Sequence, residues 1–186
     1  MRLFIAVPLP PHVKAPLSAI QQEFRRLVVQ ATWVRESALH VTLKFLGEIP
    51  AQQVESIVSC MEEASRACPT FSLTLGGIGV FPPRAQPRVL WVGVQEGSQR
   101  LVHCQEALEA SLTRAGFDPE ERPFSPHLTL ARVKRVERRD DFDACLRSHS
   151  DDTFGRLAVT HLELLESQLH PSGARYAILA SVPLAS

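Results

Sequence analysis

A short pattern that occurs twice constrains the fold of this chain more than any other feature. Residues 40–43 and residues 127–130 both read His, apolar, Thr, apolar, and almost half of the 186-residue chain separates them. Each copy lies in a strand-like segment that follows a helical pattern and a loop. Self-similarity at this spacing indicates two similar halves, roughly residues 1–90 and 91–186. We therefore expect a single bilobal domain over residues 1–186, with a pseudo-twofold relation between its halves.

The geometry of a strand gives each copy two distinct sides, because alternate side chains point to opposite faces. His40 and Thr42 share one face of their strand, and His127 and Thr129 share one face of theirs. The apolar residues between them are then free to pack on helices. If the two strands face a central cleft, four polar groups converge there.

The rest of the chain alternates between two kinds of pattern. Apolar and β-branched runs predict strands, and apolar residues at helical spacing predict helices. The two kinds are interspersed without a regular strand-helix-strand repeat, which favours an α+β fold with mainly antiparallel sheets over a doubly wound parallel one. The predicted strands cover residues 2–9, 39–46, 71–80, 89–94, 127–133, 157–169 and 175–183, and the predicted helices cover residues 15–29, 52–67, 98–115 and 140–148.

The composition limits the partners of the chain. Its 20 Lys+Arg and 20 Asp+Glu residues give a formal net charge of +0, so no protein-wide positive field is available to hold long nucleic acid. No apolar stretch approaches the roughly 20 residues that a membrane-spanning helix needs, and the N-terminal apolar run is too short for a signal peptide. We expect a monomeric cytoplasmic protein that has no membrane partner and binds phosphate at a local site.

The cysteines add a second limit. None of the four belongs to a Cys-x-x-Cys pair or lies near a Cys/His cluster in the sequence. Their scatter predicts no zinc site and suits a reducing compartment, and Cys60 and Cys68, eight residues apart on one face of a helical pattern, are expected to be buried thiols. The four cysteines are Cys60, Cys68, Cys104 and Cys145.

The two histidines carry the candidate chemistry. The unperturbed pKa of histidine is about 6.5, so one imidazole can act as a base while the other acts as an acid near neutral pH. The hydroxyls of Thr42 and Thr129 can donate hydrogen bonds to the oxygens of a bound anion. The bland alternative, a strand histidine and a β-forming threonine, fits one isolated copy better than it fits a matched pair.

Other catalytic classes fit less well. A metal site at the two histidines lacks a paired Asp, Glu or Cys, so we expect no metal and no cofactor. A serine hydrolase would need a nucleophile elbow, which neither Ser37 nor Ser125 has. The glycines of residues 76–79 lack the Lys and helix of a phosphate-binding loop and predict a turn or bulge instead.

Residues close to the motifs are candidates for substrate binding. Strand parity places Lys44 on the His40/Thr42 face, whereas it places Arg132 opposite His127, so a role for Arg132 needs a bend or bulge. The basic residues from 132 to 139 either attract an RNA end or form a solvated charge run. Four aromatic residues are candidates for stacking on a base or for core positions: Phe45, Phe81, Phe124 and Tyr176.

At these residues the chain resembles a known family, the RNA 2′,3′-cyclic phosphodiesterases, also called 2′-5′ RNA ligases, of the two-histidine phosphoesterase superfamily. The resemblance covers essentially the whole chain, and Ala174 stands where many relatives have Pro. It is carried by residues 2–6, 33–34, 40–47, 90–93, 124–132, 167–169 and 173–176.

This resemblance implies a bilobal α+β fold with both motifs in a central cleft and no metal requirement. It implies hydrolysis of a terminal RNA 2′,3′-cyclic phosphate to a 2′-phosphate, with His40 as the general acid and His127 as the general base. The residues alone do not orient the pair, because the two motifs are nearly identical. A small cyclic nucleotide as substrate, reversible 2′-5′ ligation, and a non-catalytic module that binds a nucleotide or RNA end stay open as alternatives.

Overall fold

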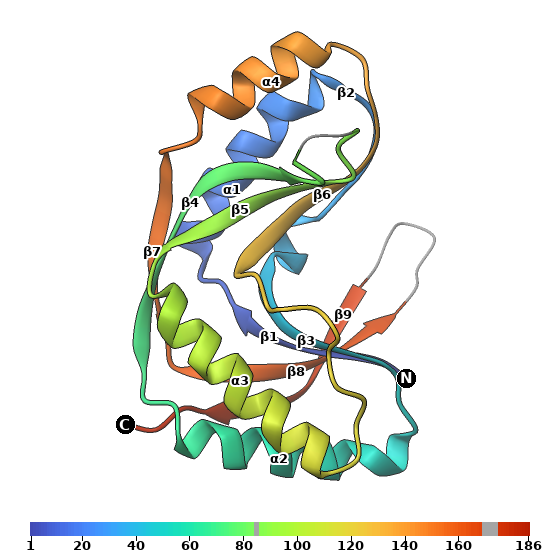
Figure 1. Cartoon of the computed structure of the whole chain (residues 1–186), viewed down its shortest axis with the longest axis vertical. Coiled ribbons are helices and arrows are strands. Elements are labelled where there is room, and N and C mark those ends of the chain that lie inside the picture. Colours follow the sequence, from blue (N-terminus) through green and yellow to red (C-terminus); the bar gives the residue numbers. More distant parts are fainter. Residues whose placement is uncertain (84–85, 169–174) are drawn as a thin grey trace.

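Two antiparallel sheets and four α-helices make up the computed structural model of the chain (Figure 1), which describes residues 1–83, 86–168 and 175–186. The prediction of an α+β fold with antiparallel sheets is confirmed. The strands are β1 (Arg2–Pro8), β2 (Val28–Trp33), β3 (His40–Glu48), β4 (Phe71–Phe81), β5 (Val89–Glu96), β6 (His127–Val136), β7 (Thr153–Val159), β8 (His161–Gln168) and β9 (Arg175–Pro183). The helices are α1 (Pro11–Arg25), α2 (Val54–Arg66), α3 (Ser98–Arg114) and α4 (Arg139–Ser148).

The two sheets exchange strands between the halves of the sequence. One sheet has the order β3-β1-β8-β9 and the other the order β2-β6-β5-β4-β7. In the four-stranded sheet, β3 with the first histidine motif pairs with β1 of its own half, and β1 pairs in turn with β8 of the other half. In the five-stranded sheet, β6 with the second motif pairs with β5 of its own half, and β5 pairs in turn with β4 of the other half. Each sheet therefore takes strands from both halves of the chain.

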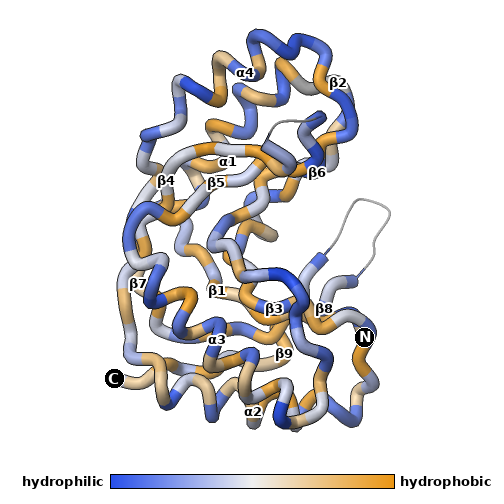
Figure 2. Tube along the Cα trace, in the orientation of Figure 1, coloured by the Kyte–Doolittle hydropathy of each residue, from blue (hydrophilic) through white to orange (hydrophobic). Residues whose placement is uncertain are grey.

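The helices cover one face of each sheet. Helices α2 and α3 pack together and contact β9 and β3 of the four-stranded sheet, while α1 contacts β7 and β2 of the five-stranded sheet. Helix α4 lies beside α1, where the rings of Phe24 and Phe142 meet edge to face with centroids 5.4 Å apart (Figure 1). Apolar and polar residues are interspersed along each helix (Figure 2), as expected for helices with one buried side.

Two predicted segments differ from the structure. The single strand predicted over residues 157–169 is two strands that belong to different sheets, because the alternation of buried residues shifts phase between Val159 and Leu162. The predicted helix 15–29 is the helix Pro11–Arg25, and the chain enters β2 at Val28. A proline in the first turn suits the earlier start at Pro11.

The glycine-rich segment of residues 76–79 lies within β4. A register shift in β4 between Gly76 and Ile78, with a positive φ of 70° at Gly77, confirms a bulge in the glycine-rich segment.

No helix within the described residues is long and apolar enough to cross a membrane. Residues 169–174, which include the last residue of the predicted strand 157–169 and Ala174, lie outside the described residues.

Candidate active site

The two histidine motifs open two strands that contact each other across the boundary between the sheets. His40 is the first residue of β3, His127 is the first residue of β6, and these strands are in contact (Figure 1). In both motifs the histidine and threonine are partly exposed while the two apolar residues are buried. The alternation predicted from the sequence therefore holds at both motifs.

The backbone fixes the same tautomer in both imidazoles. His40 Nδ1–H donates to the carbonyl oxygen of Ala38 at 2.6 Å, and His127 Nδ1–H donates to that of Ser125 at 2.7 Å. A carbonyl oxygen can only accept, so Nδ1 must carry the proton in each ring. In the neutral form of each ring, Nε2 is consequently the basic nitrogen and is available for proton transfer.

A bulge follows the threonine in both motifs. Where β1 pairs with β3, Ala6 lies opposite Thr42 but Ile5 lies opposite Lys44. Where β5 pairs with β6, Trp91 lies opposite Thr129 but Leu90 lies opposite Ala131. One extra residue in each strand reverses the alternation that strand parity predicts beyond that point.

The bulge in β3 overturns the prediction for Lys44. This residue is only 5% exposed, and its Nζ donates to Glu109 Oε1 of α3 at 2.8 Å and to the carbonyl oxygen of Asp118 at 2.9 Å. The expectation that Lys44 shares the His40/Thr42 face is therefore wrong, because the bulge turns its side chain toward the helices. Phe45, which is 60% exposed, follows it on the opposite side of the strand.

The bulge in β6 has the opposite consequence for Arg132. Leu130 and Ala131 are both buried, and Arg132 after them is exposed. Burial raises the pKa of Tyr176 on β9, a strand of the other sheet, and the charges of Arg132 and Arg2 oppose this rise. The bulge thus turns Arg132 to the His127/Thr129 side of β6, the side that a substrate role requires.

His40 lies in an aromatic environment. Its ring centroid is 4.8 Å from that of Phe4 and 5.3 Å from that of Tyr176. Burial lowers the pKa of His40 to about 4, the hydrogen bond to Ala38 opposes this shift, and the charge of Lys14 adds to it. In the free protein the His40 imidazole is therefore neutral at pH 7.

His127 has a different neighbour, the ring of Phe81, which meets it edge to face at 5.2 Å. Phe81 also contacts the Trp91 ring at 5.2 Å. A Cβ on Gly79 would lie 2.2 Å from Trp91 Cζ2, so only glycine leaves room for this indole. Trp91 Nε1 is buried without a hydrogen-bond partner among the described residues.

The other candidates from the sequence separate into site and surface residues. Phe45, Phe81 and Tyr176 lie around the histidines, whereas Phe124 packs against the main hydrophobic core. Of the basic run after Arg132, Lys134 and Arg135 belong to β6, whereas Arg138 and Arg139 stand at the start of α4. There Arg138 pairs with Asp141, and Arg139 pairs with Asp143 at 2.9 Å.

Three residues near the histidines were not singled out in the sequence analysis: Phe4, Lys14 and Trp91. Phe4 and Trp91 belong to strands that pair with the motif strands, so the repeat of strand and motif in each half carried a signal for them. Lys14 comes from α1, and nothing local in the sequence relates it to His40.

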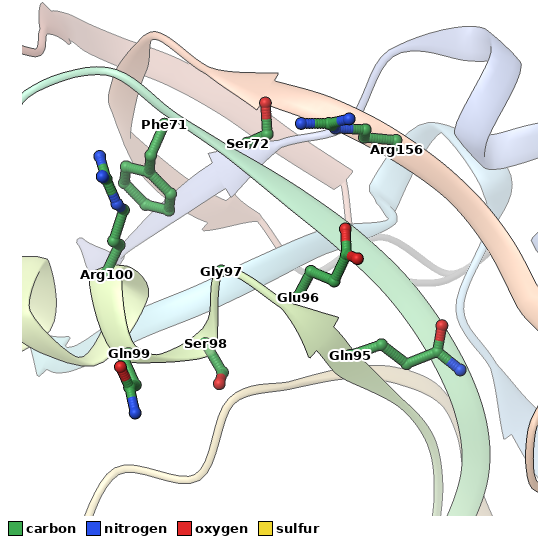
Figure 3. Close-up of a pocket in the computed structure, with 9 residues that line it drawn as sticks. All are labelled: Phe71, Ser72, Gln95, Glu96, Gly97, Ser98, Gln99, Arg100 and Arg156. Carbon is green, nitrogen blue, oxygen red and sulfur yellow. The ribbon is translucent and has the colours of Figure 1, made fainter.

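A large hollow elsewhere on the molecule contains none of these residues. It has a volume of about 590 Å³ and lies where β5 leads into α3 (Figure 3). Its wall includes Gln95, Arg100 and Arg156, and no residue of either histidine motif lines it. The histidine site is thus distinct from this hollow.

Two matched His-x-Thr strands on antiparallel sheets define the class of two-histidine phosphoesterases. The family model described as LigT like Phosphoesterase matches residues 7–91 and again residues 92–176. The chain belongs to this family of enzymes.

Similar proteins agree with this assignment. An RNA 2′,3′-cyclic phosphodiesterase of Thermotoga maritima is 35% identical over 179 residues, which cover 96% of this chain and 93% of that protein. The crystal structure of TT0787 of Thermus thermophilus matches with a TM-score of 0.81 and 29% identity, covering 99% of this chain and 98% of that one. The crystal structure of E. coli LigT complexed with 3′-AMP matches with a TM-score of 0.75 and 26% identity, covering 100% of this chain and 98% of that one.

Proposed function

We propose that the protein hydrolyses 2′,3′-cyclic phosphate ends of RNA to 2′-phosphates by acid and base catalysis with two histidines. The observation that carries this proposal is the matched pair of imidazoles, each with Nδ1 held by a backbone carbonyl and Nε2 left for proton transfer. The activity named for the relatives supports the choice of substrate. The proposed chemistry uses the protein's own groups, the two imidazoles and the hydroxyls of Thr42 and Thr129.

In the proposed reaction His127 is the base and His40 is the acid. His127 Nε2 takes a proton from water as the water oxygen bonds to phosphorus, and the bond between phosphorus and the 3′ oxygen breaks. His40 Nε2 gives its proton to the departing 3′ oxygen, which leaves a 2′-phosphate and a 3′-hydroxyl. In-line displacement needs the two groups on opposite sides of phosphorus, which two separate strands can supply.

The acid role sets a requirement for His40. An acid must be protonated when substrate is bound, whereas burial lowers the pKa of His40 to about 4 in the free protein. A phosphate anion beside the ring favours the charged imidazolium and raises this pKa. The proposal therefore requires that substrate binding protonates His40, and the roles exchange if it does not.

The threonines and Arg132 are the proposed anion-binding groups. Thr42 and Thr129 lie on the same strand faces as the histidines, where their hydroxyls can donate to the non-bridging phosphate oxygens. Arg132, which the bulge in β6 turns to the same side, supplies a positive charge. Lys44 has no place in this set, because its ammonium group is paired with Glu109.

Aromatic rings next to His40 suit a nucleobase. Phe4, Ala6 and Leu165 form a small apolar cluster, separate from the main core, and Tyr176 packs against it. Exposed Phe45 lies 6.0 Å from Phe4 between ring centroids. Aromatic side chains at an accessible site can stack on an unpaired base, which fits a single-stranded RNA end.

The direct test is to incubate the protein, in the presence of a chelator, with an oligoribonucleotide that ends in a 2′,3′-cyclic phosphate. We expect a 2′-phosphate end; because 2′- and 3′-phosphates have the same mass, the product is digested to nucleotides and the terminal one is compared with 2′- and 3′-nucleotide standards by chromatography. Binding without turnover would favour a binding module, and turnover of only 2′,3′-cyclic mononucleotides would favour a small-molecule esterase. A 3′-phosphate product would contradict the proposed bond cleavage.

The same reaction can test ligation. A 5′-hydroxyl of a second RNA in place of water would give a 2′-5′ linkage through the same acid and base. Adding an RNA with a 5′-hydroxyl end and looking for a longer product distinguishes hydrolysis alone from reversible joining.

A further inference from the structure

A cluster of three different metal-ligating side chains lies on the helix side of the five-stranded sheet, away from the face that carries His127. Glu23 comes from α1, Cys145 from α4, and His149 directly follows α4 as its C-cap. Their ligand atoms, one carboxylate oxygen, Sγ and Nε2, all lie within 4.8 Å of one another. The fold thus brings Glu23 next to two residues, Cys145 and His149, that lie far from it in the sequence.

The distances within the cluster fit a tetrahedral metal. Glu23 Oε1 lies 3.2 Å from His149 Nε2 and 3.4 Å from Cys145 Sγ. Zinc bond lengths of about 2.0–2.3 Å at tetrahedral angles place neighbouring N and O ligands about 3.4 Å apart and S and O ligands about 3.6 Å apart. Both distances to Glu23 are thus within a few tenths of an ångström of those between zinc ligands, and the third pair, Cys145 Sγ and the His149 nitrogen, lies within 4.8 Å.

The outer contacts of the cluster are also those of a metal site. His149 Nδ1–H donates to Asp152 Oδ2 at 2.6 Å, which leaves Nε2 directed at Glu23. A carboxylate on the far nitrogen is the usual partner of a histidine that binds zinc. Cys145 is 8% exposed while the Glu23 side chain is 52% exposed, so water can reach a fourth position from the Glu23 side.

We propose that Glu23, Cys145 and His149 bind a zinc ion, with Asp152 as the carboxylate that orients His149. The mixture of thiolate, imidazole and carboxylate suits zinc, whereas magnesium and calcium take oxygen ligands. On binding, the metal replaces the protons on Cys145 Sγ and His149 Nε2 and links α1 to α4. The sequence predicted no zinc site because the cysteines form no Cys-x-x-Cys pair or Cys/His cluster, and here one of the three ligands comes from another element, α1.

Binding is tested with the tag-free protein stripped by EDTA and titrated with Co²⁺, a spectroscopic substitute for zinc. We expect one equivalent to bind with intense visible bands of tetrahedral cobalt and a near-ultraviolet band from thiolate to cobalt, and Zn²⁺ to abolish both. Cys145→Ala should lose the thiolate band. Cys60→Ala, a second buried free thiol, and His161→Gln, a histidine near Glu163 without a thiol, should keep it.

Two further variants keep the test decisive if Cys145→Ala does not fold. Asp152→Asn leaves all three ligands and should weaken cobalt binding about 10- to 100-fold, and Glu23→Gln removes an exposed ligand and should weaken it at least as much. Zinc should raise the Tm of the wild-type protein, with a smaller rise for Glu23→Gln. Absence of a thiolate band at any cobalt concentration, or equal affinity in Glu23→Gln, would overturn the proposal whatever the enzymatic activity.

Discussion

The two histidine motifs have the same backbone and different surroundings. Both imidazoles are oriented by a carbonyl two residues earlier, and both strands bulge directly after the threonine. Beyond the bulge the first motif buries Lys44 and exposes Phe45, whereas the second buries Ala131 and exposes Arg132. The repeat thus keeps the position of the imidazole, while the residues after the bulge make one half aromatic and the other cationic.

Removing either Nε2 while keeping the contact of Nδ1 should reduce activity more than any other change. In His40→Asn and His127→Asn the amide nitrogen can still donate to Ala38 or Ser125. Turnover of a 2′,3′-cyclic phosphate should fall at least about a hundredfold in each, the usual scale of acid or base catalysis. The control His161→Asn should keep normal turnover, and a folded motif variant that also keeps it would make that histidine structural.

Variants of Lys44 and Glu109 test whether the bulge in β3 buries Lys44 as an ion pair. In Lys44→Met the carboxylate of Glu109 loses its cation, and we expect the free energy of unfolding to fall by about 3 kcal/mol in urea titrations. The double variant Lys44→Met/Glu109→Leu should recover most of this loss, and KM should change little in both. A stable Lys44→Met protein with a strongly raised KM would restore Lys44 as a substrate-binding residue.

Stability should depend on pH through His40. Its pKa of about 4 in the folded protein lies below the unfolded value of 6.5, so the unfolded chain binds the extra proton first as pH falls. The wild-type protein should therefore lose about 2–3 kcal/mol between pH 7 and pH 4 from this group. Urea titrations of His40→Asn should show a correspondingly smaller loss, and an identical loss would mean that His40 is not desolvated.

Arg132 gives the smallest of these effects. We expect Arg132→Gln to lower kcat/KM about tenfold, since a charged contact to phosphate is worth roughly 1.5–3 kcal/mol when fully formed and Arg132 is exposed. Raised salt should lower the kcat/KM of the wild-type protein more than that of the variant. Arg147→Gln, on α4, is the matched control, and equal kinetics for Arg132→Gln and this control would remove Arg132 from the site.

The sequence predicted the parts of this site that depend on local pattern. Alternation correctly placed His40, Thr42, His127 and Thr129, because the His and Thr of each motif are only two residues apart and precede the bulge. Lys44 was misplaced because a bulge is set by pairing with β1, which a parity count does not include. The condition stated for Arg132 was met by the same kind of bulge in β6.

The sequence did not predict the contacts between elements that are distant along the chain. The rings of Phe4 and Tyr176 meet at His40 from β1 and β9, at opposite ends of the chain. The cluster of Glu23 with Cys145 depends on α1 packing beside α4. Only the tertiary fold brings β9 to β1 and α4 to α1, so periodicity and motif spacing do not predict these contacts.

The proposed mechanism depends most on His40, which must gain its catalytic proton from substrate binding. NMR titration of the His40 ring, assigned with His40→Asn, tests this directly in the free protein and with a bound 2′-nucleotide product. We predict a pKa near 4 without ligand and a clear rise with it. A His40 pKa that stays equally low in the complex would contradict the acid role and give that role to His127.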